Sequence, residues 1–138
     1  MSLGRRVSKD VAEPYEADRR LAATYRDRLA AATGAEHALR AAQADERPAA
    51  ELRPLARTFE AALTEVLAAA EAGERVEMGP KVYVTGAQDA KARRTAEIAR
   101  RRAGARHSVR PWTAEVDRLR TARETHKLSF RPGPAIGV

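Results

Sequence analysis

A long apolar stripe between residues 52 and 70 constrains the fold of this chain more than any other feature. Its members recur mostly at spacings of three or four residues, and they are Leu52, Leu55, Phe59, Leu63, Val66, Leu67 and Ala70. Such spacing places them on one face of an α-helix of about five turns. A helix of this kind needs its apolar face covered, so other elements must supply a partner surface.

Two further helices are predicted ahead of the stripe. Pro14 suits the first turn of a helix and Gly34 suits its end, which predicts one helix over 14–33. Residues 35–44 predict a second, weaker helix, and residues 1–13 a loose N-terminal arm. The near-heptad spacing of the stripe favours antiparallel packing on the first helix, with pairing to another copy as the alternative.

After the stripe the periodicity of the sequence changes. We expect the stripe helix to end at Gly73. Apolar and polar residues then alternate on both sides of Gly79-Pro80, which predicts a short β-hairpin near 75–85. A single strand over 81–85 is the alternative, because Pro is unusual in a tight hairpin loop.

The C-terminal third predicts two helices and a tail. The first helix spans about 87–103, with the small residues Ala92, Ala96, Ala99 and Ala103 as its inward stripe. Pro111 predicts an extended segment over 105–112, and Thr113 can cap a last helix over 114–126. The tail over 128–138 is rich in Pro and Gly, yet it also holds apolar residues that we expect to dock on this chain or a neighbour.

These elements predict a mainly α protein, a small helical domain with a short β-hairpin or single strand near 75–85 and an extended C-terminal tail. The domain would span 14–127, divided into a helical pair or three-helix unit over 14–73 and a basic β-helix-helix portion over 74–127. Its core would be thin, because 31 of the 138 residues are Ala. Each buried methyl contributes only about 0.8 kcal/mol, so stability borrowed from a partner or ligand is expected.

Residues 81–110 carry the entire net charge of the protein. They hold nine Lys or Arg against two acidic residues, a net of +7, which equals the net charge of the whole chain. The candidate nucleic-acid-binding residues, named here the basic cluster, are Lys91, Arg93, Arg94, Arg100, Arg101, Arg102, Arg106 and Arg110. Tyr83 and Trp112 flank the cluster and could stack on bases. A cationic helix of this kind is typical of phosphate-backbone binding, with an acidic protein surface as the alternative partner.

The remaining composition argues against most enzyme classes. The chain has no cysteine, and its histidines (His37, His107 and His126) are scattered, so neither a metal site nor a cofactor is expected. No serine lies in a nucleophile-elbow context, and no paired carboxylates suggest acid–base catalysis. No segment resembles a secretory signal or a membrane span. We expect a cytoplasmic protein, or a virion protein if it belongs to a phage.

Two functions fit these features. The first is a small basic non-enzymatic protein that contacts the nucleic-acid backbone through its Arg-rich helix with low base specificity, on DNA rather than RNA. The second is a structural or connector subunit of a larger assembly such as a phage particle. The apolar stripe and the apolar tail would then make protein–protein contacts, in a homo-oligomer or a larger assembly.

Overall fold

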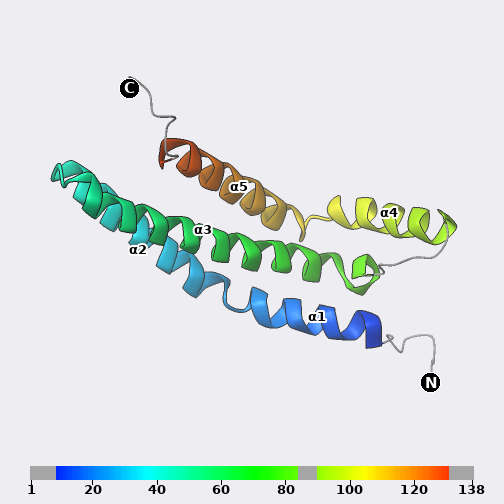
Figure 1. Cartoon of the computed structure of the whole chain (residues 1–138). Coiled ribbons are helices and arrows are strands. Elements are labelled where there is room, and N and C mark those ends of the chain that lie inside the picture. Colours follow the sequence, from blue (N-terminus) through cyan, green and yellow to red (C-terminus); the bar gives the residue numbers. More distant parts are fainter. Residues whose placement is uncertain (1–8, 84–89, 131–138) are drawn as a thin grey trace.

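The computed structural model describes residues 9–83 and 90–130, and these are almost entirely helical (Figure 1). The elements are α1 (Lys9–Ala22), α2 (Tyr25–Ala44), α3 (Ala49–Met78), the short 3-10 helix η2 (Pro80–Tyr83), α4 (Ala90–Gly104) and α5 (Arg110–Phe130). The prediction of a mainly α protein is therefore confirmed. Among these residues no β-strand is present.

Helix α3 is the central element, and it runs antiparallel to two broken rods (Figure 1). Helices α1 and α2 follow one another along one side of α3, and α4 and α5 follow one another along the other. The chain thus runs up, down and up again, as short connections between helices favour. The two rods place α1, η2 and α4 at one end of the molecule and α2 and α5 toward the other.

The apolar stripe of α3 forms the core, as its spacing predicts. Phe59, Leu63, Val66 and Ala70 are buried between α2 and α5, with Leu52, Leu55 and Leu67 half-buried beside them. Helix α2 contributes Ala32 and Leu39, and α5 contributes Val116 and Leu119. Each fully buried Leu or Val contributes roughly 1.5–3 kcal/mol. The expectation that the stripe packs within its own chain is confirmed.

The N-terminal boundaries differ from the prediction. Helix α1 already begins at Lys9, so residues 9–13 are not a loose arm, and residues 1–8 lie outside the described residues. The predicted single helix over 14–33 is instead broken near Thr24. There the hydroxyl of Thr24 donates to the Leu21 carbonyl at 2.6 Å and accepts from the Arg28 guanidinium at 2.8 Å. A side chain that bonds to the backbone in this way competes with the helix.

Gly34 does not end a helix, which corrects a second boundary. Helix α2 continues through it to Ala44, so the predicted helix over 35–44 is the second half of α2. Ala32 and Leu39, seven residues apart on one face, are both buried against α3. Their packing outweighs the weak helix propensity of a single glycine.

Gly73 does not end α3 either, and its role is packing. The helix continues to Met78, and a Cβ atom at Gly73 would lie 2.6 Å from Cζ3 of Trp112. The glycine therefore lets the indole ring of α5 rest directly on the backbone of α3. Helix α3 ends instead at Gly79, whose φ of 99° lies in the region that favours glycine.

The β element predicted near 75–85 is not confirmed. Residues 75–78 form the last turn of α3, and residues 80–83 form η2, so the alternation there does not produce strands. Val82 and Tyr83 are both buried against the helices. An alternation of only four residues is short enough to fit a helical turn as well as a strand. Residues 84 and 85 lie outside the described residues.

The extended segment predicted over 105–112 is also wrong. Residues 105–109 form a tight turn, and α5 begins at Arg110, so Pro111 occupies the first turn, where its missing N–H has no helical partner to lose. Thr113 lies inside α5, which extends from Arg110 to Phe130 rather than over 114–126. The first three residues of the predicted tail are therefore helical, and 131–138 lie outside the described residues.

Candidate nucleic-acid interface

Helix α4 rests on the molecule through small side chains. Ala103 is buried, Ala96 and Ala99 are half-buried, and the helix packs mainly against η2 with a lighter contact to α3. The predicted small-residue stripe is thus confirmed at these three positions, and the side chain of Ala92 lies outside the described part. An alanine face permits close approach but buries little apolar area.

All eight residues of the basic cluster are exposed. At 100° per residue, Arg94 and Arg101 point directly away from the alanine face of α4. Arg93 and Arg100 lie on one flank, while Lys91 and Arg102 lie on the other. The cations of α4 therefore cover an arc of about 200° around the helix rather than one flat face.

Few of these cations have a carboxylate partner. Among the described residues only Arg101 pairs with one, Glu97, at 3.6 Å, and both side chains are well exposed. Arg100 donates to the backbone carbonyl of Val82 at 3.3 Å, and Arg106 donates to that of Met78. The first bond ties α4 to η2 and the second ties the following turn to the end of α3, and both leave the positive charges uncompensated.

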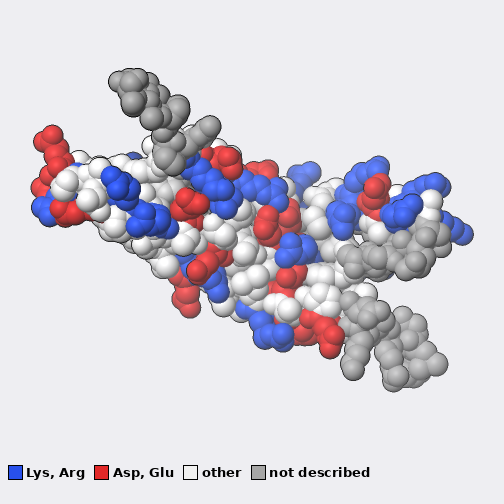
Figure 2. Space-filling view, in the orientation of Figure 1, with Lys and Arg blue, Asp and Glu red and all other residues white. Residues whose placement is uncertain are grey.

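The arginines elsewhere in the molecule behave differently. Seven of the twelve arginines in 9–83 and 111–130 lie within 4.0 Å of a carboxylate, against one of seven in 90–110. Figure 2 shows the result: blue and red are interspersed over the helical bundle, and blue dominates over α4. Among the described residues, arginines without a carboxylate partner are therefore densest at the α4 end, with six of seven there against five of twelve elsewhere.

Tyr83 is not presented for base stacking. Its ring is buried and meets Tyr15 edge to face at 5.5 Å, while its hydroxyl donates to Asp18 at 2.5 Å. Arg75 donates to the same carboxylate at 2.7 and 3.1 Å. Burial alone would raise the pKa of Asp18, but the bonds from Arg75 and Tyr83 outweigh it and lower that pKa below its usual value. This network joins α1, α3 and η2.

Trp112 is likewise engaged inside the fold. Its ring packs on Gly73 and meets Tyr25 edge to face at a centroid distance of 5.2 Å. The Tyr25 hydroxyl donates to Glu115, and burial followed by this bond raises the pKa of Tyr25 to about 12. The placement of Tyr83 and Trp112 argues against the stacking role expected for both.

Several polar side chains that the sequence left unassigned join neighbouring helices. Glu71 and Glu74 share α3, because Gly73 does not break it, and they pair with Arg120 at 2.7 Å and Thr113 at 2.6 Å. Both partners lie on α5, so these bonds fasten α3 to α5. The spacing of three residues between Glu71 and Glu74 indicates a shared helix face, but a helix end predicted at Gly73 separates them.

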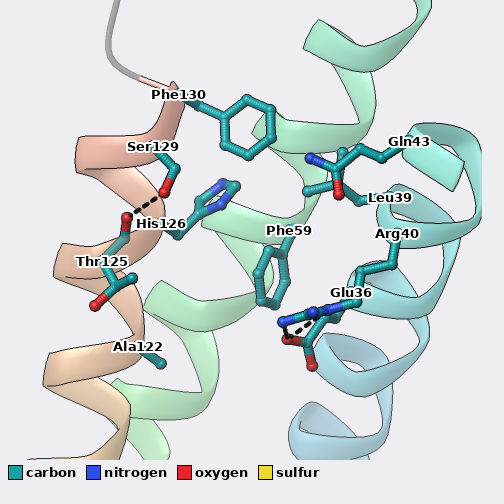
Figure 3. A pocket seen from close by; sticks show the side chains of 10 residues that line it. All are labelled: Glu36, Leu39, Arg40, Gln43, Phe59, Ala122, Thr125, His126, Ser129 and Phe130. Atoms are coloured by element: carbon teal, nitrogen blue, oxygen red, sulfur yellow. Dashed lines mark hydrogen bonds and ion pairs between the residues drawn. The ribbon is translucent and has the colours of Figure 1, made fainter. Parts of the chain in front are cut away.

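His126 has a structural role, whereas His37 and His107 are exposed. The buried imidazole donates from Nε2 to the Ala56 carbonyl at 2.8 Å and packs against Phe59 and Phe130. Figure 3 shows these rings on one side of a groove of about 340 Å³. No group of three metal-ligating His, Asp or Glu side chains occurs within the described ranges.

The groove of Figure 3 lies between α2, α3 and α5, and sequence reasoning did not anticipate it. Leu39 and Phe59 supply its apolar side chains, and Phe130 lies at its α5 edge. On the α2 side Arg40 pairs with Glu36 at 2.8 Å, which neutralises both charges. The groove is thus part apolar and part internally paired, without an excess of either charge sign around Phe59.

No family model, curated protein or solved structure matches this chain. Within 9–83 and 90–130, no helix has both the length and the apolar character required to cross a membrane.

Proposed function

We propose that this protein is a non-enzymatic nucleic-acid-binding protein that contacts the phosphate backbone through the basic cluster. The observation that carries the proposal is the exposure of those eight cations, of which only Arg101 has a carboxylate partner among the described residues. An arginine already held by a neighbouring carboxylate must lose that pair to bind a phosphate. Most arginines of α4 have no such pair to break, and a guanidinium can bind a phosphate through two hydrogen bonds.

The shape of α4 favours duplex DNA as the ligand. An α-helix with its side chains is about 10–12 Å across, which matches the major groove of B-DNA at about 12 Å. Cations over an arc of about 200° can meet the phosphates on both walls of such a groove. The deep, narrow major groove of RNA duplexes does not admit a helix in this way.

Low base specificity follows from the same residues. Half of the exposed residues described in α4 are arginines, and there is neither an Asn or Gln for adenine nor an available aromatic ring among its described residues. Phosphate contacts position a protein on DNA without reading its sequence. With about five to eight contacts, log K should fall with log salt at a slope of about −5 to −7.

The test is binding of a fluorescein-labelled DNA duplex, measured by anisotropy over a range of salt concentrations. Arg93→Ala, Arg94→Ala and Arg101→Ala are combined in one variant, because alanine preserves the helix and the one ion pair lost, Arg101 with Glu97, lies within α4 and is exposed. We expect weaker binding and a slope shallower by about 3. Binding that is unchanged, or insensitive to salt in the unaltered protein, would refute the proposal.

A matched control removes the same charge elsewhere. Arg26, Arg53 and Arg57 are exposed on α2 and α3 and have no carboxylate partner among the described residues. Their combined replacement by Ala lowers the net charge equally, so it reports the effect of charge alone. We expect its salt slope to stay close to that of the unaltered protein.

The second candidate function is a structural subunit of a larger assembly. The supporting observation is Leu128, which is 64% exposed on the last turn of α5. Contact with another chain would remove this leucine side chain from water. Light scattering tests this: an oligomer that Leu128→Glu converts to a monomer supports assembly, and a monomeric unaltered protein contradicts it.

A further inference from the structure

A second groove lies beside α4, between this helix and the segment that joins α3 to η2. Met78 and Pro80 line one wall, and Ala99 and Ala103 of α4 line the other. Its volume is about 710 Å³. Because Ala99 and Ala103 are small, the α4 wall leaves space between them and Met78.

The rim of this groove is cationic. Lys81, Arg102 and Arg106 line it, and no acidic residue does. All three side chains are exposed, and none lies within 4.0 Å of a carboxylate of the described chain. Arg106 donates to the Met78 carbonyl, which holds its guanidinium across the end of α3. The groove therefore combines an apolar lining with positive charge that the described residues do not compensate.

Ile98 gives the groove an apolar lip. It is 42% exposed, and among the described residues Leu128 is the only other large apolar side chain with comparable exposure. It stands on α4 one turn before Arg102, among charged neighbours. An apolar side chain at the edge of an alanine-lined groove is suited to contact an inserted apolar group.

We propose that this groove binds an acidic, amphipathic segment of a partner protein. An apolar side chain of that segment would enter between Met78 and Ala99 and contact Ile98. Carboxylates on either side of it would pair with Lys81, Arg102 and Arg106. This inference goes beyond DNA binding and does not depend on it: Arg102 and Arg106 belong to the basic cluster, but the apolar lining of the groove plays no part in phosphate binding.

The charges of the groove favour this occupant over the others. A second copy would bring its own α4, which repels the first through like charges. A nucleic acid supplies phosphates but no aliphatic group for the space beside Ile98. A membrane surface is flat or convex on this scale, whereas the apolar residues here lie inside a groove between two walls.

The groove and the outward arginines can be separated by mutation. On the helical wheel, Ala99 and Ala103 point about 140–180° away from Arg94 and Arg101, while Ile98 lies about 40° from Arg94 at the outer edge of the groove. Replacing the outward arginines should therefore weaken DNA binding and spare the groove. Replacing Ile98 should have the opposite effect.

The experiment uses the full chain and a short fluorescein-labelled peptide of Glu residues with Leu at i and i+4. A second peptide has Gln in place of each Leu and the same charge. We expect the Leu peptide to bind more tightly, and Ile98→Gln to weaken it about tenfold, as loss of an aliphatic contact does. Leu128→Gln is the matched control, since it removes the other exposed apolar side chain, and it should change nothing.

Three readouts complete the design. Circular dichroism should show unchanged helicity in Ile98→Gln, because the side chain is exposed and glutamine favours helix. A double variant, Lys81→Gln with Arg102→Gln, should weaken both peptides. The salt dependence of DNA binding should be the same in Ile98→Gln as in the unaltered protein.

Equal affinity for the Leu and Gln peptides would overturn the proposal, because it would reduce the contact to charge alone. Unchanged affinity of Ile98→Gln for the Leu peptide would overturn it as well. Binding to vesicles of anionic lipid that falls in Ile98→Gln, without binding of the Leu peptide, would assign the groove to a membrane and contradict it. Failure of DNA binding alone would leave the peptide result intact, so the two proposals fail separately.

Discussion

The two ends of this molecule hold together by different means. Between α2, α3 and α5 the contacts are made by large side chains such as Phe59, Leu63 and Leu119. At the other end α4 rests on alanines and on two hydrogen bonds, from Arg100 and Arg106 to backbone carbonyls. The same contrast holds for charge, because the arginines of the bundle mostly pair with carboxylates and those of α4 mostly do not.

The comparison teaches that arginine content alone carries little functional meaning in this chain. Arginines are abundant everywhere, with 22 in the sequence, and in the bundle they serve to fasten helices, as Arg75 does with Asp18 and Arg120 with Glu71. What distinguishes α4 is that only one of its arginines, Arg101, has such a partner among the described residues. A surface charge without an intramolecular partner is available to a ligand.

The largest expected effect comes from opening the apolar core. Leu119→Ala should lower the free energy of unfolding by about 2–5 kcal/mol, because Leu119 is fully buried and leaves a cavity. Ile98→Ala on α4 should change it by no more than about 0.5 kcal/mol, since the side chain is exposed. Urea denaturation measures both. Equal losses of unfolding free energy in the two variants would contradict the weaker packing of α4.

A smaller effect is expected where α3 and α5 meet. Gly73→Ala should destabilise the protein by about 1–3 kcal/mol, because the new methyl would overlap the ring of Trp112. Gly34 is the matched control: nothing lies within 4 Å of a Cβ there, so Gly34→Ala should stabilise α2 by about 0.5–1 kcal/mol. Thermal unfolding distinguishes these opposite signs. Stabilisation by both substitutions would contradict the packing assigned to Gly73.

Gly34 and Gly73 also show which features of the fold can be predicted from the sequence and which cannot. The periodic stripe identified α3 and its core residues, and the charge count identified α4 as the cationic element. Gly34 and Gly73 were both interpreted as helix ends, because a glycine either ends a helix or permits close approach. The choice at Gly73 depends on Trp112, which lies 39 positions further along the chain and is invisible to local pattern.

The candidate site was predictable to a similar depth. The position and exposure of the basic cluster follow from a cationic segment opposite an alanine stripe. The engagement of Tyr83 and Trp112 did not follow, because their partners Asp18 and Gly73 come from distant segments. The β-hairpin failed for a local reason, since a four-residue alternation fits one helical turn.

A smaller destabilisation than that of Gly73→Ala is expected at the polar contact that joins α1, α3 and η2. Asp18→Asn should lower the free energy of unfolding by about 1 kcal/mol at neutral pH, because its ion pair with the half-exposed Arg75 is partly screened by solvent. The pKa of Asp18 is lowered from 3.8 in the folded state. Its contribution is therefore complete above that value and is lost as the pH falls through the folded pKa.

The measurement is the free energy of unfolding between neutral pH and pH 2. The unaltered protein should lose stability over the acid range, and part of that loss should be missing in Asp18→Asn. Glu115, whose pKa is lowered mainly by its bond from Arg118, should account for a further part of the loss. Identical pH profiles for the two proteins would contradict the role of Asp18 at this contact.

We propose that the exposed cations of α4, rather than the net charge of the whole protein, bind duplex DNA. The most direct test of this proposal is the slope of log K against log salt for duplex DNA in two variants of equal net charge. The slope should be shallower by about 3 when Arg93, Arg94 and Arg101 become alanine, and almost unchanged when Arg26, Arg53 and Arg57 do. Equal slopes in the two variants would contradict the proposal.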